Sequence, residues 1–290
     1  MKPGLLQGIS SELPVLVAGP TASGKSALAM ELAARDGRVI VNADALQVYS
    51  CWRVLTARPS PAEEAALPHA LYGHVGRDEP YSAGHWLRQT VELLDRSVVI
   101  VGGTGLYFMA LVEGLAEVPP IPPQVRAEAD ALRAADFPAM VAGLDAATAA
   151  RIDLANPARV QRAWEVLRAT GRGLADWQAR TGAPALPLAQ AEALVVRPEV
   201  DWLNARIDAR FDAMMASGAL EEVRAELPSW NPARPSSRAI GAPELVAHLR
   251  GELPLDEAVA AARLASRRYA KRQRTWFRSR MGGWRSIALP

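Results

Sequence analysis

Short apolar runs recur along the chain and are separated by longer segments in which apolar and polar residues mix. The apolar runs cover residues 13–18, 39–41, 98–101 and 194–196. Short continuous runs bounded by turn residues are typical of strands that are buried on both faces. Because helical segments lie between them, the pattern predicts a parallel α/β sheet. In such a sheet ligands gather at the carboxyl ends of the strands.

The segments between and after these runs predict helices at residues 27–33, 81–95, 201–217 and 256–280, and another that starts at Leu106. Segment 201–217 has Asp201 where an N-cap is expected and is followed by Gly218, which suits a helix end. One apolar stripe runs along it, formed by Leu203, Ile207, Phe211 and Met214. Such a stripe is typical of a helix face that packs on a core.

A proline-rich stretch at residues 119–123 interrupts this alternation, with four prolines in five residues. Such a stretch is stiff and indicates a boundary. Beyond it, to about residue 187, the pattern is helical and rich in alanine and arginine. We therefore predict a core formed by residues 1–118 and 190–290, with an all-helical insertion at 119–189.

The first apolar run leads into residues 19–26, Gly-Pro-Thr-Ala-Ser-Gly-Lys-Ser, which fit the phosphate-binding P-loop pattern G-x-x-x-x-G-K-[ST]. A strand before it and a helix after it are the context that this motif needs. Backbone N–H groups, the helix N-terminus and Lys25 would hold an anion, and the Ser26 hydroxyl would hold Mg²⁺. These flanks disfavour the alternative, a glycine-rich turn without a ligand. The predicted phosphate-binding residues are Gly19, Thr21, Ala22, Ser23, Gly24, Lys25 and Ser26.

Composition narrows the class of protein. The chain has 290 residues, half of them apolar, which is typical of a soluble globular protein. A single cysteine, Cys51, excludes an internal disulfide, and we expect it to be a small buried residue. Residues 1–14 lack the apolar stretch of a signal peptide, and the longest apolar stretch, 98–112, is too short to span a bilayer. These features predict a cytoplasmic protein without a membrane partner.

Charge is distributed unevenly, although the net charge is only +2. Residues 258–290 contain nine Lys or Arg and no Asp or Glu. A basic segment of this kind predicts an acidic polymer as partner.

Four stretches together carry a resemblance that the P-loop alone does not. They are the P-loop, Asp-Ala-Leu-Gln-Val-Tyr at 44–49, Gly-Gly-Thr-Gly-Leu-Tyr at 102–107 and Ala-Lys-Arg-Gln-Arg-Thr-Trp-Phe at 270–277. In this order they closely resemble the tRNA dimethylallyltransferase family, and the resemblance extends over almost the whole chain. The last two stretches are far more specific than the P-loop, which many families share.

The resemblance implies a P-loop NTPase-like parallel sheet with flanking helices and a helical insertion that binds the tRNA anticodon stem-loop. It implies that dimethylallyl diphosphate gives its five-carbon group to the exocyclic N6 of the adenosine 3′-adjacent to the anticodon, in tRNAs that read U-initial codons. Pyrophosphate leaves and Mg²⁺ assists. A monomer is the simplest expectation.

The resemblance also assigns catalytic roles to three residues, each with an ordinary structural alternative. Asp44 matches the base that accepts the proton of the adenine amine; on the residues alone a helix N-cap is equally favoured. Thr104 matches a position at the reaction centre, and its alternative is a turn residue. Arg210 matches a pyrophosphate-binding arginine, whereas without the resemblance Arg206 and Arg210 would both be interpreted as surface arginines of a helix.

Family positions that contact tRNA fall on two groups of residues here, Asp44, Ala45, Leu46, Gln47 and Thr104, and then Arg126, Ala158, Arg159, Val160, Gln161 and Arg162. For each arginine, a solvated helix face is the alternative interpretation. The chain departs from the family pattern at Ala45, where a serine is frequent, and at Ala242, where an aromatic residue is usual.

Three rival functions are open to the same motifs. An ATP-dependent small-molecule kinase usually needs a second acidic Mg²⁺ ligand after a strand, whereas the third strand here leads into Gly102, Gly103 and Thr104. An enzyme that prenylates free adenine nucleotides would not need the insertion. A non-catalytic RNA-binding protein would not need Lys25 together with Asp44.

Overall fold

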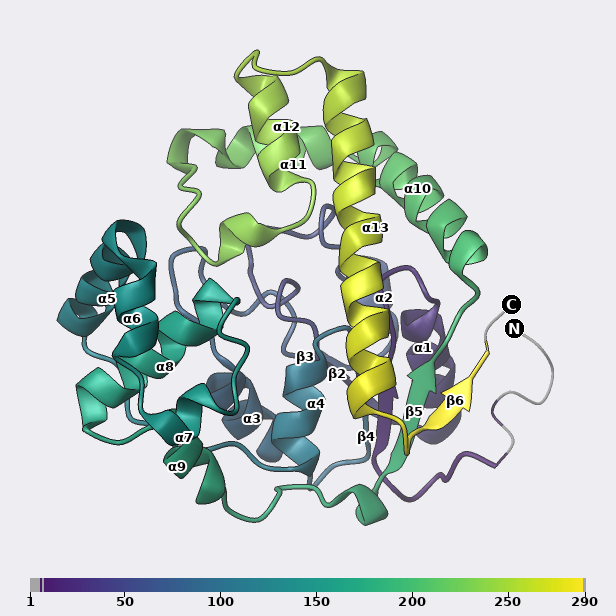
Figure 1. Cartoon of the computed structure of the whole chain (residues 1–290). Helices are drawn as coiled ribbons and strands as arrows, with labels where there is room; N and C mark the ends of the chain where they lie inside the picture. The colour runs from purple at the N-terminus through teal and green to yellow at the C-terminus, as the bar shows by residue number, and fades with distance from the viewer. Residues whose placement is uncertain (1–5, 7, 289–290) are drawn as a thin grey trace. The chain divides into compact units, whose positions relative to one another are not determined.

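One parallel sheet organises the fold, and Figure 1 shows it beside the long C-terminal helix. The computed structural model describes residue 6 and residues 8–288. Within them, six strands pair in the order β3-β2-β4-β1-β5-β6, and every pairing is parallel. The strands are β1 (Val15–Ala18), β2 (Val39–Asn42), β3 (His69–Ala70), β4 (Val98–Gly102), β5 (Glu192–Val196) and β6 (Arg285–Ile287).

The four strands predicted from apolar runs are confirmed, as is their parallel arrangement. The edge strands β3 and β6 were not predicted. They have only two and three residues, and Ile287 is the one fully buried side chain in them. Elements this short carry no periodic signal.

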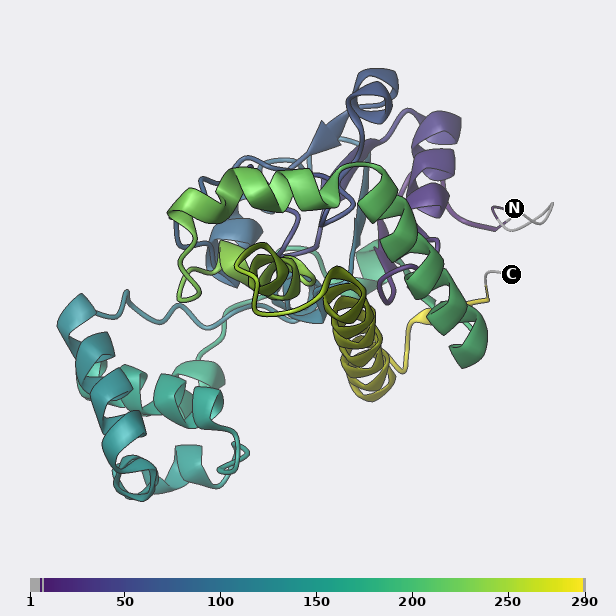
Figure 2. The same ribbon diagram turned by 90° about the horizontal axis from the view of Figure 1, so that it is seen from above.

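Helices cover both faces of the sheet, which explains why the strand sequences are continuously apolar. Helix α1 (Lys25–Asp36) packs on the face formed by residues such as Val17, Ile40 and Val99. The opposite face is covered by α3 (Ala83–Val91), α4 (Gly105–Val112) and the C-terminal end of α13 (Leu255–Arg280) (Figure 2). The helix predicted at 81–95 is shorter than expected, because α3 begins at Ala83 and ends at Val91.

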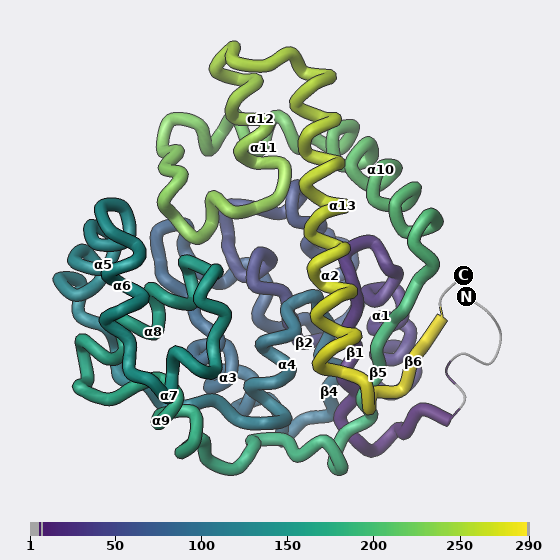
Figure 3. Tube along the Cα trace, in the orientation of Figure 1, coloured from purple at the N-terminus to yellow at the C-terminus, as the bar shows by residue number. Residues whose placement is uncertain are grey.

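A second core joins the later helices to the loop after β2. Helices α10 (Val200–Ala216) and α12 (Ala242–Leu249) pack along α13, and their neighbour along the chain is α11 (Ala219–Glu226) (Figure 3). Trp52 and Leu55 of the loop are buried among these helices. Ala242, where the family usually has an aromatic residue, is fully buried in the same core. The short helix α2 (Pro61–Ala66) lies earlier in the chain.

Helix α10 begins one residue before the expected position, so the predicted N-cap is wrong. Glu199 is the N-cap, and its carboxylate accepts the N–H groups of Asp201 and Trp202 at 2.9 and 3.1 Å. Asp201 lies in the first turn instead, where a negative charge still favours the helix N-terminus. The expected end is confirmed, because α10 stops at Ala216 and Gly218 follows with φ 97°.

The chain divides into two compact units, one formed by residues 1–112 and 186–290 and the other by residues 113–185. The second unit consists of α5 (Pro123–Ala135), α6 (Phe137–Ala142), α7 (Ala146–Ala149), α8 (Pro157–Thr170) and α9 (Leu174–Ala179). Ala129, Met140 and Val160 form its own buried core. The division falls a few residues before the expected boundaries at 119 and 189.

Cys51 is only partly buried, not fully buried as expected, and packs against the second core. Burial and the nearby Glu226 raise the pKa of its thiol to about 11. Among the described residues, no helix combines the length and hydropathy that a bilayer crossing requires. The expectation about a signal peptide at residues 1–14 falls partly on residues 1–5 and 7, which lie outside the described part of the chain.

The loop that follows β2 is held by one carboxylate of α11. Glu222 accepts the backbone N–H groups of Arg53, Val54 and Leu55 at 2.6, 3.0 and 2.8 Å. Three consecutive backbone N–H groups therefore depend on a single side chain as acceptor, and these hydrogen bonds hold the loop in place.

We predict that Glu222→Ala lowers the free energy of unfolding by about 1 to 3 kcal/mol, because it leaves partly buried N–H groups without an acceptor. Chemical denaturation would measure the change. Glu221→Ala is the matched control, because Glu221 is exposed on the same helix and pairs only with Arg224. A loss for Glu222→Ala no larger than that of the control would contradict the assigned role.

Candidate active site

Three loops meet at the carboxyl edge of the sheet because they follow adjacent strands. In the strand order, β4 lies between β2 and β1. The Gly19 N–H donates to the Gly102 carbonyl at 3.3 Å, and the Thr104 N–H donates to the Ala43 carbonyl at 3.0 Å. The Ala45 N–H also donates to Thr104 Oγ1 at 2.9 Å. These bonds confirm the expectation that the loops after the three strands share one edge.

The P-loop has the backbone geometry of an anion cradle. Gly24 is the N-cap of α1 with φ 89°, a left-handed conformation that favours glycine, and Ala22 also has a positive φ of 61°. The Lys25 ammonium folds back and donates to the Pro20 carbonyl at 3.3 Å. In the described structure the buried Ser23 hydroxyl has no hydrogen-bond partner. An oxygen-rich anion would satisfy such a group, because buried polar groups are nearly always paired.

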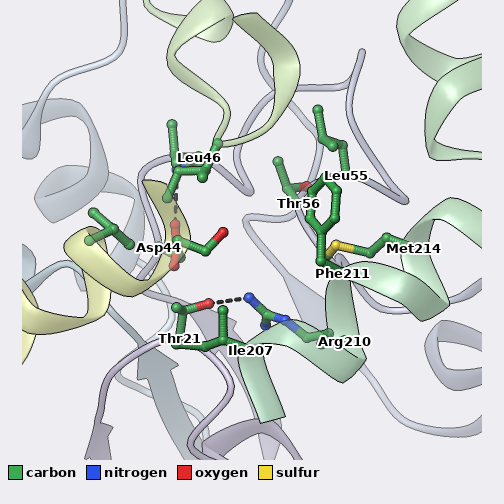
Figure 4. A pocket seen from close by; sticks show the side chains of 12 residues that line it. Thr21, Asp44, Leu46, Leu55, Thr56, Ile207, Arg210, Phe211 and Met214 are labelled. Atoms are coloured by element: carbon green, nitrogen blue, oxygen red, sulfur yellow. Dashed lines mark hydrogen bonds between the residues drawn. The ribbon is translucent and has the colours of Figure 1, made fainter. Parts of the chain in front are cut away.

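Two cations and one carboxylate surround this loop. Burial lowers the pKa of Lys25 to about 8, while the nearby Asp44 acts in the opposite direction. Burial likewise lowers the pKa of Arg210 to about 10, again opposed by Asp44. Arg210 donates a hydrogen bond to the Thr21 hydroxyl (Figure 4). Buried like charges disfavour each other, so a bound anion would stabilise both cations.

Asp44 and Arg210 line a cavity with a polar end and an apolar end, shown in Figure 4. Its volume is about 490 Å³, part of it open to solvent. Thr21, Asp44 and Arg210 form the polar end. The apolar lining comes from α10 and from the loops after β2 and before α12, with Leu55, Ile207, Phe211, Met214 and Ile240. A ligand with a charged head and a short hydrocarbon tail would match both ends.

Asp44 caps a turn rather than a helix. Its Oδ1 accepts the Leu46 N–H at 3.0 Å, and its carbonyl accepts the Gln47 N–H at 3.2 Å. Since residues 45–48 form turns, the helix N-cap alternative is wrong. Asp44 lines the cavity.

The unit formed by residues 1–112 and 186–290 brings together the P-loop, Asp44, Thr104 and Arg210, as the contacts above show. Ala45 and Leu46 are half-buried beside them. The side-chain amide of Gln47 is already engaged, because it donates to the carbonyls of Thr56 and Ala57 at 2.8 and 3.0 Å.

The remaining predicted RNA contacts lie in the helical unit and differ in exposure. Arg126, Ala158, Arg159 and Arg162 are exposed. The side chain of Val160 is fully buried in the core of that unit. Gln161 is 8% exposed and donates to Asp130 and Glu165. The tRNA contacts expected at these two positions stay predictions.

Sequence reasoning missed several residues that contact the site. Arg206 is exposed, but its Nε donates to the Ala22 carbonyl at 3.1 Å and its guanidinium stacks on Trp202. Its spacing of four from Arg210 was the available signal. The apolar stripe of α10 packs on the core as predicted. It also supplies Ile207 and Phe211 to the cavity. Gln273 also contacts the site, through its side-chain carbonyl and amide groups. It belongs to the stretch at 270–277 noted in the sequence, which gave it no individual role.

The sheet order and the loop after β1 define a P-loop NTPase-like protein. The family model of the IPP transferases matches residues 47–280, and that of the isopentenyl transferases matches residues 14–69. The chain belongs to the IPP transferase family.

Individual relatives agree with this assignment. A tRNA dimethylallyltransferase of Cereibacter sphaeroides is 71% identical over 98% of this chain and 92% of its own. One from Paracoccus denitrificans is 54% identical over 98% and 97% of the two chains. The crystal structure of the tRNA isopentenylpyrophosphate transferase from Bacillus halodurans is 29% identical, with a TM-score of 0.68 over 96% of this chain and 90% of that one.

The lowered pKa of Lys25 predicts a pH-dependent affinity for diphosphate esters. In the free protein the pKa of the Lys25 ammonium is lowered to about 8. A bound diphosphate would raise this pKa, because it stabilises the protonated form. Binding above pH 8 must therefore restore this proton, so the affinity falls by up to about tenfold per pH unit. Calorimetric titration with methyl diphosphate from pH 7 to 9 would measure it.

The control for this titration is Lys25→Arg, whose guanidinium stays charged over the whole range and removes the slope. An affinity of the native protein that is flat from pH 7 to 9 would contradict the role of the Lys25 ammonium.

Proposed function

We propose that this protein transfers a dimethylallyl group from dimethylallyl diphosphate to N6 of the adenosine 3′-adjacent to the anticodon, in tRNAs that read U-initial codons. One observation carries the proposal. Thr21 of the P-loop, a carboxylate and an apolar wall share a single cavity, where Thr21, Asp44 and Phe211 all face inward. A prenyl diphosphate and an amine acceptor need this combination.

The cationic end of the cavity suits the leaving group. Breaking the allylic C–O bond places negative charge on pyrophosphate and positive charge on carbon. Lys25, Arg210 and the P-loop amides would stabilise the leaving charge, and they are held in place before the reaction. The contact of Arg210 with Thr21 supports this, because it holds the guanidinium against the P-loop.

Asp44 would accept the proton from the adenine amine. That amine is a poor nucleophile because its lone pair is delocalised into the ring, so a carboxylate hydrogen-bonded to it would raise its reactivity. The Leu46 N–H fixes one oxygen of Asp44 at 3.0 Å and leaves the other for the acceptor. Thr104, whose Oγ1 is held by the Ala45 N–H, would orient the base from the neighbouring loop.

The residues at the start of α1 fit Mg²⁺, which prefers hard oxygen ligands. Ser26 offers an exposed hydroxyl at the beginning of this helix. No group of three or more His, Cys, Asp or Glu side chains in the described residues could hold a metal by itself. Ser26 would thus share the ion with diphosphate oxygens. When bound, Mg²⁺ would supply charge neutralisation on the leaving group.

The helical unit and α13 would bind the RNA. An adenosine stacked in a loop must be splayed out before its N6 can react. Arg126, Arg159 and Arg162 are exposed residues of the helical unit, which suits phosphate contacts, although Arg162 also pairs with Glu165 at 3.9 Å. Because the described site lies within one chain, we propose that a monomer is active, and that it works in the cytoplasm beside its tRNA substrate.

We predict that Asp44→Asn reduces the rate of the chemical step by about 10², the usual effect of a lost general base. The affinity for methyl diphosphate should stay within a few fold, because the P-loop remains. Single-turnover transfer of the dimethylallyl group to unmodified tRNA would measure the rate.

Asp95→Asn serves as the matched control, since Asp95 is an exposed carboxylate away from the cavity. If Asp44→Asn turns over as fast as this control, Asp44 only caps its turn.

We also predict that Arg159→Ala weakens tRNA binding and lowers the slope of log affinity against log salt by about 0.7 to 0.9, the change expected for one lost phosphate contact. Filter binding at several salt concentrations would measure it. Arg180→Ala, another exposed arginine of the helical unit, is the comparison. An unchanged slope would remove Arg159 from the RNA-binding face.

A further inference from the structure

Gln273 of α13 joins two loops of the site that are far apart in the sequence. Its Oε1 accepts the Thr21 N–H at 2.9 Å, and its Nε2 donates to the Gly103 carbonyl at 3.0 Å. Thr21 belongs to the P-loop after β1, and Gly103 belongs to the loop after β4. The side chain is only 5% exposed. One buried amide therefore spans the two loops.

We propose that Gln273 is a positioning residue that sets the spacing between the diphosphate-binding P-loop and the acceptor-binding loop at Gly103 and Thr104. The inference rests on the proposed function, because it assigns the donor to the first loop and the adenosine to the second. No resemblance or motif gives this residue a role.

The chemistry of the amide allows only one orientation. The Thr21 backbone group offers a donor and so must face the oxygen, whereas the Gly103 carbonyl must face the nitrogen. A buried donor or acceptor left without a partner is costly, so neither contact is lost without penalty. Gln273 thus acts as a spacer of fixed length between the loops.

Close packing at Gly103 makes the spacing strict. A β-carbon added there would lie 2.2 Å from Gln273 Nε2 and 3.3 Å from Asp44 Oδ2. Only glycine lets the amide approach this closely, and the same glycine adjoins the proposed base. Gly103 thus adjoins both the Gln273 amide and the Asp44 carboxylate.

Helix α13 brings a second polar side chain to the site. Tyr269 lies one helical turn before Gln273 and lines the cavity. Burial raises the pKa of its hydroxyl, and the neighbouring side chains of Gln273 and Thr104 act in the opposite direction. Tyr269 and Gln273 therefore face the site from the same helix.

This arrangement predicts an effect on the chemical step rather than on binding. Each loop would still hold its own substrate after the spacer is lost, but the reacting atoms would no longer be aligned. Misplacement by about 1 Å costs roughly 10² in rate. We expect Gln273→Leu to lower kcat by about 10² and to change KM for dimethylallyl diphosphate by less than about threefold.

The experiment measures kcat, KM and the thermal midpoint of Gln273→Leu with unmodified tRNA, at a temperature well below that midpoint. Phe277→Leu is the matched control, because Phe277 is buried in the core one turn later on the same helix. It should lose stability while keeping kcat. If Gln273→Leu matches the control in kcat, or if KM rises as much as kcat falls, the inference is overturned.

A second measurement tests the close approach of Gln273 Nε2 to Gly103 directly, by combining substitutions at the two positions. Gly103→Ala should lower kcat strongly in the native background, because its methyl group meets the amide of Gln273. In a Gln273→Ala background the amide is absent, so adding Gly103→Ala should cost clearly less than in the native background, and only the approach of the methyl group to Asp44 Oδ2 at 3.3 Å remains. Equal costs in both backgrounds would contradict the contact between the two residues.

The same assays separate the two claims. Wild-type protein that transfers no dimethylallyl group overturns the proposed function. Wild-type protein that is active, together with a fully active Gln273→Leu, overturns only the role of Gln273.

Discussion

Hydrogen bonds between neighbouring loops at one sheet edge hold the whole site together. Because β2, β4 and β1 are adjacent and parallel, the loops that follow them end within reach of each other. The bonds from Gly19 to Gly102 and from Thr104 to Ala43 join these loops through the backbone, which no side-chain substitution removes. Side chains of α10 and α13 then reach the same loops, so helices from the end of the chain complete a site that starts at Gly19.

Electrostatics explains why this edge receives an anion. Lys25 and Arg210 are two partly buried cations held beside a single carboxylate, Asp44, and desolvation lowers the pKa of both cations. The free site is therefore short of negative charge, and a diphosphate supplies it. The apolar lining next to these groups includes Phe211. A hydrocarbon tail bound there would be removed from water, which is favourable. Under the proposed function, charge and burial together would favour a prenyl diphosphate over an inorganic anion.

The sequence predicted the central strands, the P-loop and the meeting of three loops, because apolar runs and a glycine motif are local signals. It could not predict the edge strands β3 and β6, which are too short to carry a pattern. Local pattern also misplaced the N-cap of α10, since Glu199 and Asp201 look alike as acceptors near a helix start. Side-chain contacts between residues far apart in the sequence could not be predicted from local patterns. Gln273 reaches the P-loop over a separation of 252 residues, and only the packing of α13 on the sheet brings it there.

The central claim is that the P-loop serves prenyl transfer to RNA rather than phosphoryl transfer. The most direct measurement is the transfer of radiolabelled dimethylallyl from its diphosphate, with Mg²⁺, to unmodified tRNA that reads U-initial codons. Free AMP would be offered as an alternative acceptor in a parallel assay. ATP hydrolysis would be measured separately. The account predicts label in tRNA alone. Label in AMP would assign the protein to free-nucleotide prenylation. ATP hydrolysis without label in either acceptor would contradict the account.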